Sequence, residues 1–286
     1  MNYKTMLFIP GNNPGMLMSM DVLVADAYIV DLEDAVSLDN KDAARNLVKS
    51  YLNTFTNDKP YDIYVRINPP DTPFFDDDVE ALKDAKINGL MLAKADPDNI
   101  VILDKKLEGT DLRIFALIET ARSLELAYEI LSKVKRTEGV LLGAEDLTLD
   151  LGAKRTKSSD EIKYARAKIV SAAKAAGVQA VDTPWTDTDD IPGLRQDTEL
   201  AKAMGMTGKA LISPRHVDDV NELFSPSKED INYAKRVFKA LEEAKKEGKG
   251  AFSLDGKMVD KPIILRATDV LKQAGEFTEE LNGLIK

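Results

Sequence analysis

The chain has 286 residues, a formal net charge of −10, one histidine and no cysteine. Without cysteine there is no disulfide or thiolate metal site, and a single histidine excludes a multi-histidine zinc site within one chain. The acidic balance argues against nucleic-acid binding, which requires a basic face. General acid–base chemistry therefore falls mainly to carboxylates.

Hydropathy gives no sign of a membrane protein. The first apolar run, Met6–Ile9, is too short for the core of a signal peptide, and no later run approaches the ~18 apolar residues of a membrane span,. We therefore expect a cytoplasmic protein with no membrane partner.

Short apolar, β-branched runs alternate with amphipathic helical stretches along most of the chain. This alternation predicts a (β/α)8 TIM barrel, because parallel strands need crossover helices between them. A doubly wound sheet fits less well, since the turn at residues 10–15 is not a dinucleotide-binding fingerprint. The predicted strands are Met6–Ile9, Ala27–Val30, Ile63–Ile67, Gly89–Leu92, Arg113–Ile118, Gly139–Leu142, Val178–Val181 and Lys209–Ile212. Predicted helices include Lys41–Tyr51, Asp78–Ala85, Ala121–Val134 and Ser159–Ala176.

The remainder of the chain predicts a C-terminal helical arm. We place the barrel at residues 1–224 and a helical extension at 225–286, which we expect to pack on a neighbouring subunit. The expected segments are a helix near Val217–Leu223, a Ser-Pro-Ser break at 225–227, a charged helix from Lys228 to about Lys246, a glycine-bearing link at 247–250, and a last helix from about Pro262 to Leu281,.

Polar residues at the carboxyl ends of the strands are the candidate site residues, because the active face of such barrels lies there. The set is rich in carboxylates and contains one arginine. Its members are Asp31–Asp34 after the second strand, Arg66 with Asn68 on the third, Lys94–Asp96 after the fourth, Glu119 and Thr120 after the fifth, Gly143–Asp146 after the sixth, and Asp182 with Thr183 after the seventh.

A divalent cation would resolve the repulsion between carboxylates that meet at one barrel mouth. Mg2+ prefers one or two carboxylates completed by water and substrate oxygens, and we expect Glu119 and Asp146 to be its ligands.

Each candidate also has a structural interpretation. Asp146 or Asp182 could cap the helix that follows, and Arg66 could be an ion-pair partner of one of the acids. For His216 a surface or capping role is favoured over catalysis, and Trp185 either lines the mouth or packs in the fold.

The order of several segments resembles the citrate lyase beta subunit and its relatives, the citryl-CoA, malyl-CoA and citramalyl-CoA lyases of the HpcH/HpaI aldolase superfamily. Singly the segments are weak, but together they cover almost the whole chain. They are Leu7–Pro14, Asp31–Val36 with Lys41–Arg45, Val65–Asn68, Ala116–Thr120, Leu142–Leu147, Gly208–Ile212 with Pro214 and Arg215, and Asp255–Asp260.

The resemblance implies a Mg2+-dependent homotrimer or hexamer in which the C-terminal arm reaches a neighbour's active site. It implies that Glu119 and Asp146 hold the metal, that Arg66 contacts the thioester carbonyl, and that Asp260 is an acid–base residue for a neighbouring subunit. Glu33 or Asp34 would orient a water at the metal or move the substrate's hydroxyl proton. The expected substrate- and CoA-binding residues are Lys4, Pro10, Gly11, Arg66 and Lys94.

Three positions depart from the relatives. Lys4 stands where relatives commonly have arginine, and Ser213 stands where they usually have histidine or asparagine. The free-acid aldolase branch uses a histidine in the second-strand loop, where this chain has Glu33 and Asp34.

The sequence thus predicts a lyase that cleaves a citryl- or malyl-type hydroxyacyl thioester, carried by CoA or by an acyl-carrier protein, to a 2-keto acid and an acetyl thioester by a retro-Claisen reaction. The alternatives are a free hydroxy-keto-acid aldolase, a subunit active only within a multi-subunit citrate lyase, and a barrel without enzymatic activity.

Overall fold

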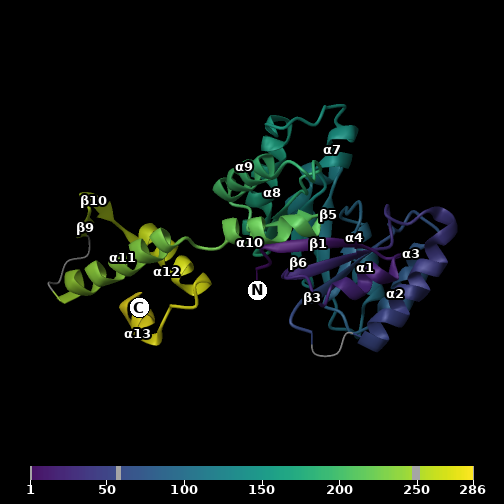
Figure 1. Ribbon diagram of the computed structural model, residues 1–286, viewed down its shortest axis with the longest axis horizontal. Coiled ribbons are helices and arrows are strands. Elements are labelled where there is room, and N and C mark those ends of the chain that lie inside the picture. The colour runs from purple at the N-terminus through teal and green to yellow at the C-terminus, as the bar shows by residue number, and fades with distance from the viewer. Residues whose placement is uncertain (1, 56–58, 247–251, 286) are drawn as a thin grey trace. The chain divides into compact units, whose positions relative to one another are not determined.

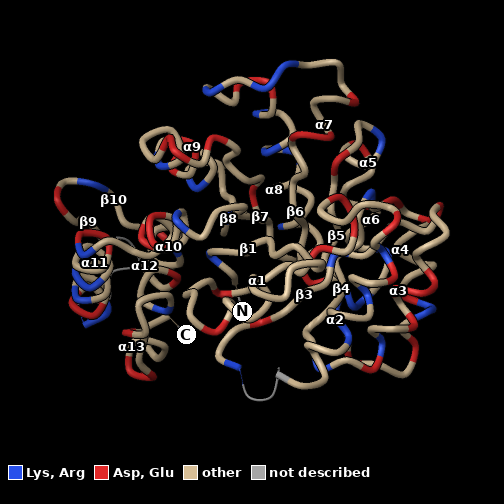
Figure 2. The backbone as a smooth tube through the Cα atoms, turned by 45° about the vertical axis from the view of Figure 1, so that its right-hand side comes forward, with Lys and Arg blue, Asp and Glu red and all other residues tan. Residues whose placement is uncertain are grey.

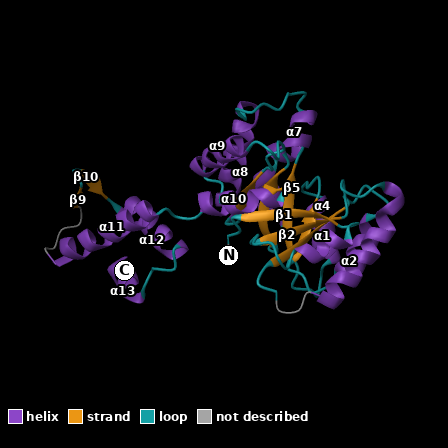
Figure 3. Cartoon of the chain, in the orientation of Figure 1, coloured by secondary structure: helices purple, strands orange, loops and turns teal. Residues whose placement is uncertain are grey.

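The eight predicted strands are present and close into one parallel barrel, in sequence order from β1 to β8, so the barrel prediction is confirmed (Figures 1 and 3). The computed structural model describes residues 2–55, 59–246 and 252–285. The strands are β1 Thr5–Pro10, β2 Ala27–Asp31, β3 Asp62–Ile67, β4 Gly89–Leu92, β5 Arg113–Ile118, β6 Thr137–Leu142, β7 Gln179–Asp182 and β8 Gly208–Leu211.

Helices surround the strands, and three of them differ from the sequence prediction. The helix expected at Asp78–Ala85 lies at Phe75–Leu82. The helix expected at Ala121–Val134 is broken at Leu126 into α5 and α6, and the one expected from Ser159 begins as a short 3₁₀ turn. The barrel helices are α1 Pro14–Ser19, α2 Lys41–Phe55, α3 Phe75–Leu82, α4 Asn99–Lys106, α5 Ala121–Glu125, α6 Ala127–Lys133, α7 Ala144–Asp150, α8 Lys163–Ala176, α9 Ile191–Met204 and α10 Val217–Phe224, with 3₁₀ turns at Leu38–Asn40, Asp160–Ile162 and Pro214–His216. Figure 2 shows that charged residues lie mainly along helices and loops, whereas the strands are mostly uncharged.

Side chains that point inward fill the interior of the barrel, so it is a packed core and not a channel. A substrate could bind only at an end of the barrel. Tyr64 and Phe115 meet edge to face with ring centroids 5.4 Å apart, a geometry that aromatic pairs favour. Gly139 lies against the Phe115 ring, where a Cβ would clash with it. Large and small residues on neighbouring strands therefore interlock, as barrel interiors require.

A buried ion cluster joins the barrel wall to α8 and α9. Arg166 donates to Asp182 and Asp197, and Lys209 donates to the same two carboxylates at 2.6 and 2.7 Å. All four side chains have at most 2% exposure. Asp182, a candidate cap or site residue by sequence, is therefore part of a structural cluster with two positive and two negative groups.

Residues Glu222–Lys286 form a separate compact unit, with residues Met1–Asn221 as the other, and the division falls inside α10. The unit contains α11 Lys228–Lys246, the antiparallel pair β9 Phe252–Leu254 and β10 Lys257–Val259, α12 Lys261–Gln273 and α13 Glu279–Ile285. Its own apolar core includes Val237, Phe238, Val259, Ala267 and Leu271.

Two features of this unit differ from the sequence prediction. The single last helix expected from Pro262 to Leu281 is divided by Gly275, whose positive φ of 69° ends α12. The β9–β10 hairpin was not predicted, although its Asp255-Gly256 turn, with φ of 52° and 75°, is a recognised hairpin signal,. The predicted link at 247–250 lies outside the described residues.

Among the helices that the structure describes, none combines the length and apolar character required to span a bilayer.

The buried ion cluster predicts a specific acid sensitivity. Burial alone would raise the pKa of Asp197, but Lys209 and Arg166 outweigh it and hold the pKa at about 2, below the ordinary 3.8. A lowered carboxyl pKa contributes stability that is present above pH ~4 and is lost as the pH falls towards 2, here about 2 kcal/mol. Denaturant titrations between pH 5 and 2.5 should show this slope in the native chain and not in Asp197→Asn.

Asp197→Asn should also lower the free energy of unfolding at pH 7 by about 3–5 kcal/mol, because it leaves two buried cations facing one carboxylate. The control is Asp189→Asn, whose ion pair with Arg215 is exposed and contributes about 1 kcal/mol or less. Identical pH profiles for native protein and Asp197→Asn would contradict the assignment.

Candidate active site

A cavity of about 450 Å³ opens at the carboxyl ends of the barrel strands. Asp31, Arg66, Glu119 and Asp146 line it together with apolar residues such as Phe8 and Ile212. The structure therefore brings together the proposed metal ligands, which come from the end of β5 and from α7, and the one arginine of the strand-end set, which comes from β3.

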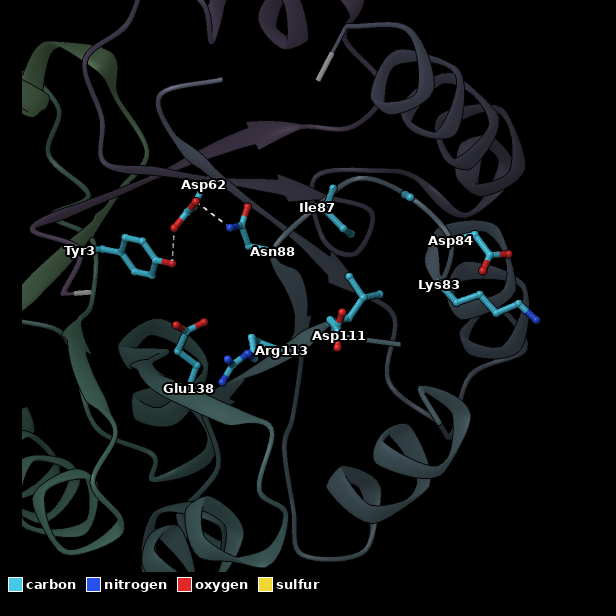
Figure 4. Close-up of a pocket in the computed structure, with 11 residues that line it drawn as sticks. Tyr3, Asp62, Lys83, Asp84, Ile87, Asn88, Asp111, Arg113 and Glu138 are labelled. Atoms are coloured by element: carbon cyan, nitrogen blue, oxygen red, sulfur yellow. Dashed lines mark hydrogen bonds between the residues drawn. The ribbon is translucent and has the colours of Figure 1, made fainter. Parts of the chain in front are cut away.

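A second cavity, of about 470 Å³, lies at the opposite end of the barrel. Figure 4 shows Tyr3 and Asn88 pointing towards Asp62, with Arg113 and Glu138 on the facing side. Tyr3 and Asn88 each donate to Asp62 at 2.6 Å, so these groups satisfy one another. We assign the chemistry to the first cavity because reactions in this fold occur at the carboxyl ends.

Arg66 is held by a bidentate ion pair with Asp31. The guanidinium donates through Nε and Nη2 to the two Asp31 oxygens at 2.8 and 2.6 Å. The same oxygens accept the backbone N–H groups of Glu33 and Ala35 at 2.9 and 3.0 Å. Asp31 thereby fixes the arginine and shapes the loop after β2 that contains Glu33 and Asp34, which we call the acidic loop. Sequence analysis did not assign this role to Asp31.

The remaining edge of Arg66 faces two further carboxylates. Nη1 lies 3.1 Å from Glu33 and 3.6 Å from Asp34, and the guanidinium stacks over the Phe8 ring with its carbon 5.1 Å from the centroid. Glu33 is buried and Asp34 exposed, with side-chain exposures of 7% and 65%. One cation therefore faces three carboxylates, of which Glu33 has an oxygen without a hydrogen-bond partner.

Glu119 is buried at the end of β5, with 3% exposure. Burial raises its pKa to about 8; the Lys94 amide and Arg66 oppose this rise, and Glu33 and Asp146 add to it. Burial also raises the pKa of Glu33, to about 7; Arg66 opposes this rise, and Asp34 and Asp31 add to it. The site thus has less positive charge than its carboxylates require, which is the condition that a divalent cation corrects.

The donor set fits Mg2+ with two protein ligands. Asp146 lines the cavity and makes no capping bond, since Gly143 is the N-cap of α7. In residues 2–55, 59–246 and 252–285 no three Asp, Glu or His groups form a ready-made metal cage. Mg2+ tolerates this, because it usually keeps several waters and takes one or two carboxylates.

The acidic loop after β2 rests on buried polar groups. Lys41 donates to the carbonyls of Leu32 and Glu33 at 2.8 and 2.6 Å. Asn68 donates to the Leu32 carbonyl and to Asp78, which also accepts from Arg45. Lys41 and Arg45, the first and last residues of one of the motif segments, are therefore buried.

The predicted substrate-binding residues are not all at the cavity. Pro10 lines it, whereas Gly11 supports it by donating its N–H to the Asp31 carbonyl at 2.9 Å. The Lys94 side chain is exposed and does not line the cavity. Lys4 precedes β1 and therefore lies at the amino-terminal end of the barrel, far from the carboxylates,.

Three other candidates also have definite places. His216 is fully buried, with Nε2 3.2 Å from the Thr188 carbonyl, so the surface position, one of the two roles predicted for it besides catalysis, is wrong. Trp185 is buried and is not among the cavity residues. Asp260 is the exposed N-cap of α12, accepting from the Ile263 N–H at 3.3 Å, and belongs to the second compact unit.

Comparison with known proteins identifies relatives over nearly the whole chain. Residues 4–214 match the model of the HpcH/HpaI aldolase/citrate lyase family. Citrate lyase subunit beta of Leuconostoc mesenteroides subsp. cremoris is 40% identical over 95% of this chain and 93% of its own. A (3S)-malyl-CoA thioesterase of Cereibacter sphaeroides is 34% identical over 95% and 94%.

A solved relative contains both a metal and a CoA ligand. The protein CitE from Mycobacterium tuberculosis, in complex with magnesium, acetoacetate and coenzyme A, matches with a TM-score of 0.81 and 33% identity. The match covers 96% of this chain and 98% of that one.

Cation binding should be linked to proton release. With a pKa of about 8 in the metal-free protein, Glu119 is mostly protonated at pH 7 and, if it is a ligand as predicted, would have to lose its proton to bind a metal. Mg2+ affinity should therefore rise by up to about tenfold per pH unit between pH 6 and 8 and level off above. Calorimetric titration at pH 7 in buffers of different ionisation enthalpy measures the released protons.

Glu119→Gln is the matched control, because it keeps the shape of the side chain and cannot release a proton. An Mg2+ affinity that is independent of pH from 6 to 8 in the native protein would contradict this linkage.

Proposed function

The chain belongs to the HpcH/HpaI aldolase/citrate lyase family, and we propose that it is a Mg2+-dependent carbon–carbon lyase acting on a citryl- or malyl-type hydroxyacyl thioester. The observation that carries the proposal is the excess of buried carboxylates around Arg66 in the carboxyl-end cavity. The relatives named as citrate lyase subunits and the CitE complex with magnesium and coenzyme A support it.

Glu119 and Asp146 would hold the Mg2+ ion, whose chemistry is that of a Lewis acid towards the hydroxyl and carboxylate oxygens of the substrate. Both residues line the cavity. The raised pKa of Glu119, caused mainly by burial, supports this role, because the carboxylate gains most when a cation neutralises it,.

Glu33 is better placed than Asp34 to accept the proton of the substrate hydroxyl. It is buried, and that burial raises its pKa to about 7. A carboxyl with a pKa nearer the working pH is a more effective general base. Loss of the hydroxyl proton lets the carbon–carbon bond break into a 2-keto acid and the enolate of an acetyl thioester.

Arg66 would stabilise the negative charge on the thioester oxygen of that enolate. Asp31 occupies Nε and Nη2, so Nη1, the edge that faces Glu33 and Asp34, is the donor available to a substrate. Asp260 would then protonate the enolate carbon, supplied by a neighbouring subunit of a homotrimer or hexamer. This completes the proton balance of the cleavage.

A second candidate function is hydrolysis of the thioester, favoured by the relatives named (3S)-malyl-CoA thioesterases. The two reactions have different products, since cleavage of the carbon–carbon bond yields a 2-keto acid and hydrolysis yields a free thiol. The relatives named citrate lyase subunit beta also favour a version of the lyase in which this chain is one subunit of a larger enzyme.

The decisive assay measures keto acid and free thiol released from citryl-, malyl- and citramalyl-CoA, with and without EDTA. We expect keto-acid release from one thioester and its loss with EDTA. Arg66→Lys should lower the rate by about 10²- to 10³-fold, because it keeps a cation among the carboxylates and removes the fixed donor.

Other outcomes separate the alternatives. Thiol release without keto acid would replace the lyase by a thioesterase. Activity restricted to an acyl-carrier thioester would make the chain a subunit of a larger lyase, and cleavage of free hydroxy-keto acids would make it an aldolase.

A shared active site can be tested by complementation between variants. Asp260→Ala and Glu119→Ala should each be inactive alone, and a mixture that exchanges subunits should regain part of the activity. Asp255→Ala is the control, since this exposed acid pairs with Arg236 in the same unit. An active Asp260→Ala protein, or no recovery in mixed oligomers, would contradict the role of Asp260.

A further inference from the structure

A backbone amide in an unusual conformation lies next to the proposed metal ligand Glu119. Lys94, just after β4, has a φ of +48°. Among non-glycine residues in the described part of the chain, positive φ occurs at only two other places, Ser159 and Asp255. Residues with a Cβ rarely adopt this left-handed conformation, because it is energetically unfavourable for them. Where it occurs, contacts of the surrounding structure hold it in place, often at functional sites.

The conformation directs one N–H group out of the sheet and towards the site. The Lys94 amide donates to Glu119 Oε1 at 2.7 Å. The next amide, that of Ala95, donates to the Leu117 carbonyl of β5 at 3.1 Å. The chain therefore returns to β5 immediately, and the amide of Lys94 alone is used for the carboxylate.

Gly143 confines Glu119 from another side. A Cβ on Gly143 would lie 2.6 Å from Glu119 Cβ and 2.9 Å from Oε2, distances that real Cβ atoms do not tolerate. One Glu119 oxygen is thus fixed by a hydrogen bond and the other is close to a backbone that only glycine permits.

The ammonium group of Lys94 takes no part in this arrangement. The Lys94 side chain is exposed and is absent from the residues that line the cavity. Its contribution to the site comes from φ and from the N–H group, neither of which depends on the charge.

We propose that Lys94 is a positioning residue that acts through its left-handed backbone, which orients the Glu119 carboxylate for a divalent cation. This inference rests on the proposed function in so far as Glu119 is taken as a Mg2+ ligand. It differs from the sequence prediction, in which the Lys94 side chain binds the substrate or its CoA group.

A substitution series separates the backbone from the charge. Lys94→Gly and Lys94→Asn remove the ammonium and accept positive φ, so their Mg2+ dissociation constants should stay within about twofold of native. Lys94→Ala and Lys94→Val resist positive φ and should weaken Mg2+ binding, with roughly tenfold or more for the β-branched valine.

The matched control is Asp255, which has a φ of 52° in the β9–β10 turn. Asp255→Val introduces the same backbone conflict away from Glu119 and should leave Mg2+ affinity unchanged. Thermal unfolding without metal verifies that every variant is folded, and Lys94→Ala serves where Lys94→Val does not fold.

Equal loss of Mg2+ affinity in the glycine, asparagine and valine variants would overturn the inference, because the ammonium would then be the required group. Native affinity in Lys94→Val would also overturn it. If the native protein binds no Mg2+, the proposed function fails, and crystal structures of the variants then decide the inference. A Glu119 side chain that is displaced in Lys94→Val but not in Lys94→Gly supports it. A Glu119 side chain that is unchanged in both variants overturns it.

Discussion

The ion pair between Asp31 and Arg66 is the interaction on which the carboxyl end of this barrel depends. It joins the ends of β2 and β3 through two hydrogen bonds, and Asp31 also accepts the two N–H groups that turn the chain into the acidic loop. The guanidinium is nearly buried, and its two-point contact with Asp31 fixes its orientation,. Its remaining edge, at Nη1, therefore points in one direction. Glu33, Asp34 and the cavity lie on that side.

Charge balance distinguishes this site from the other buried ionic cluster of the barrel. Behind β7 and β8, Arg166 and Lys209 face Asp182 and Asp197, so the two positive and two negative charges cancel. At the carboxyl end, one arginine faces more carboxylates than it can neutralise, and burial raises the pKa of Glu119. A balanced cluster leaves no net charge to compensate, whereas an excess of buried carboxylates is the condition that a cation would relieve.

Buried supports hold the unbalanced site in place. Lys41 binds two carbonyls of the acidic loop, and Asn68 joins that loop to Asp78 and thereby to Arg45. A site with repelling carboxylates needs such supports, since its own groups would otherwise move apart.

The sequence by itself determined the strands and the polar set at their ends, because apolar periodicity and the rule for parallel barrels require only local information. It thereby placed Arg66, Glu119 and Asp146 at one mouth, and the order of motifs indicated the family. Only the tertiary structure decided which acid Arg66 binds, that Asp182 belongs to a closed cluster, and that Lys41 and Arg45 are buried. These facts depend on which helix packs against which strand and on the direction of each side chain. The periodicity of apolar residues along the sequence predicts neither.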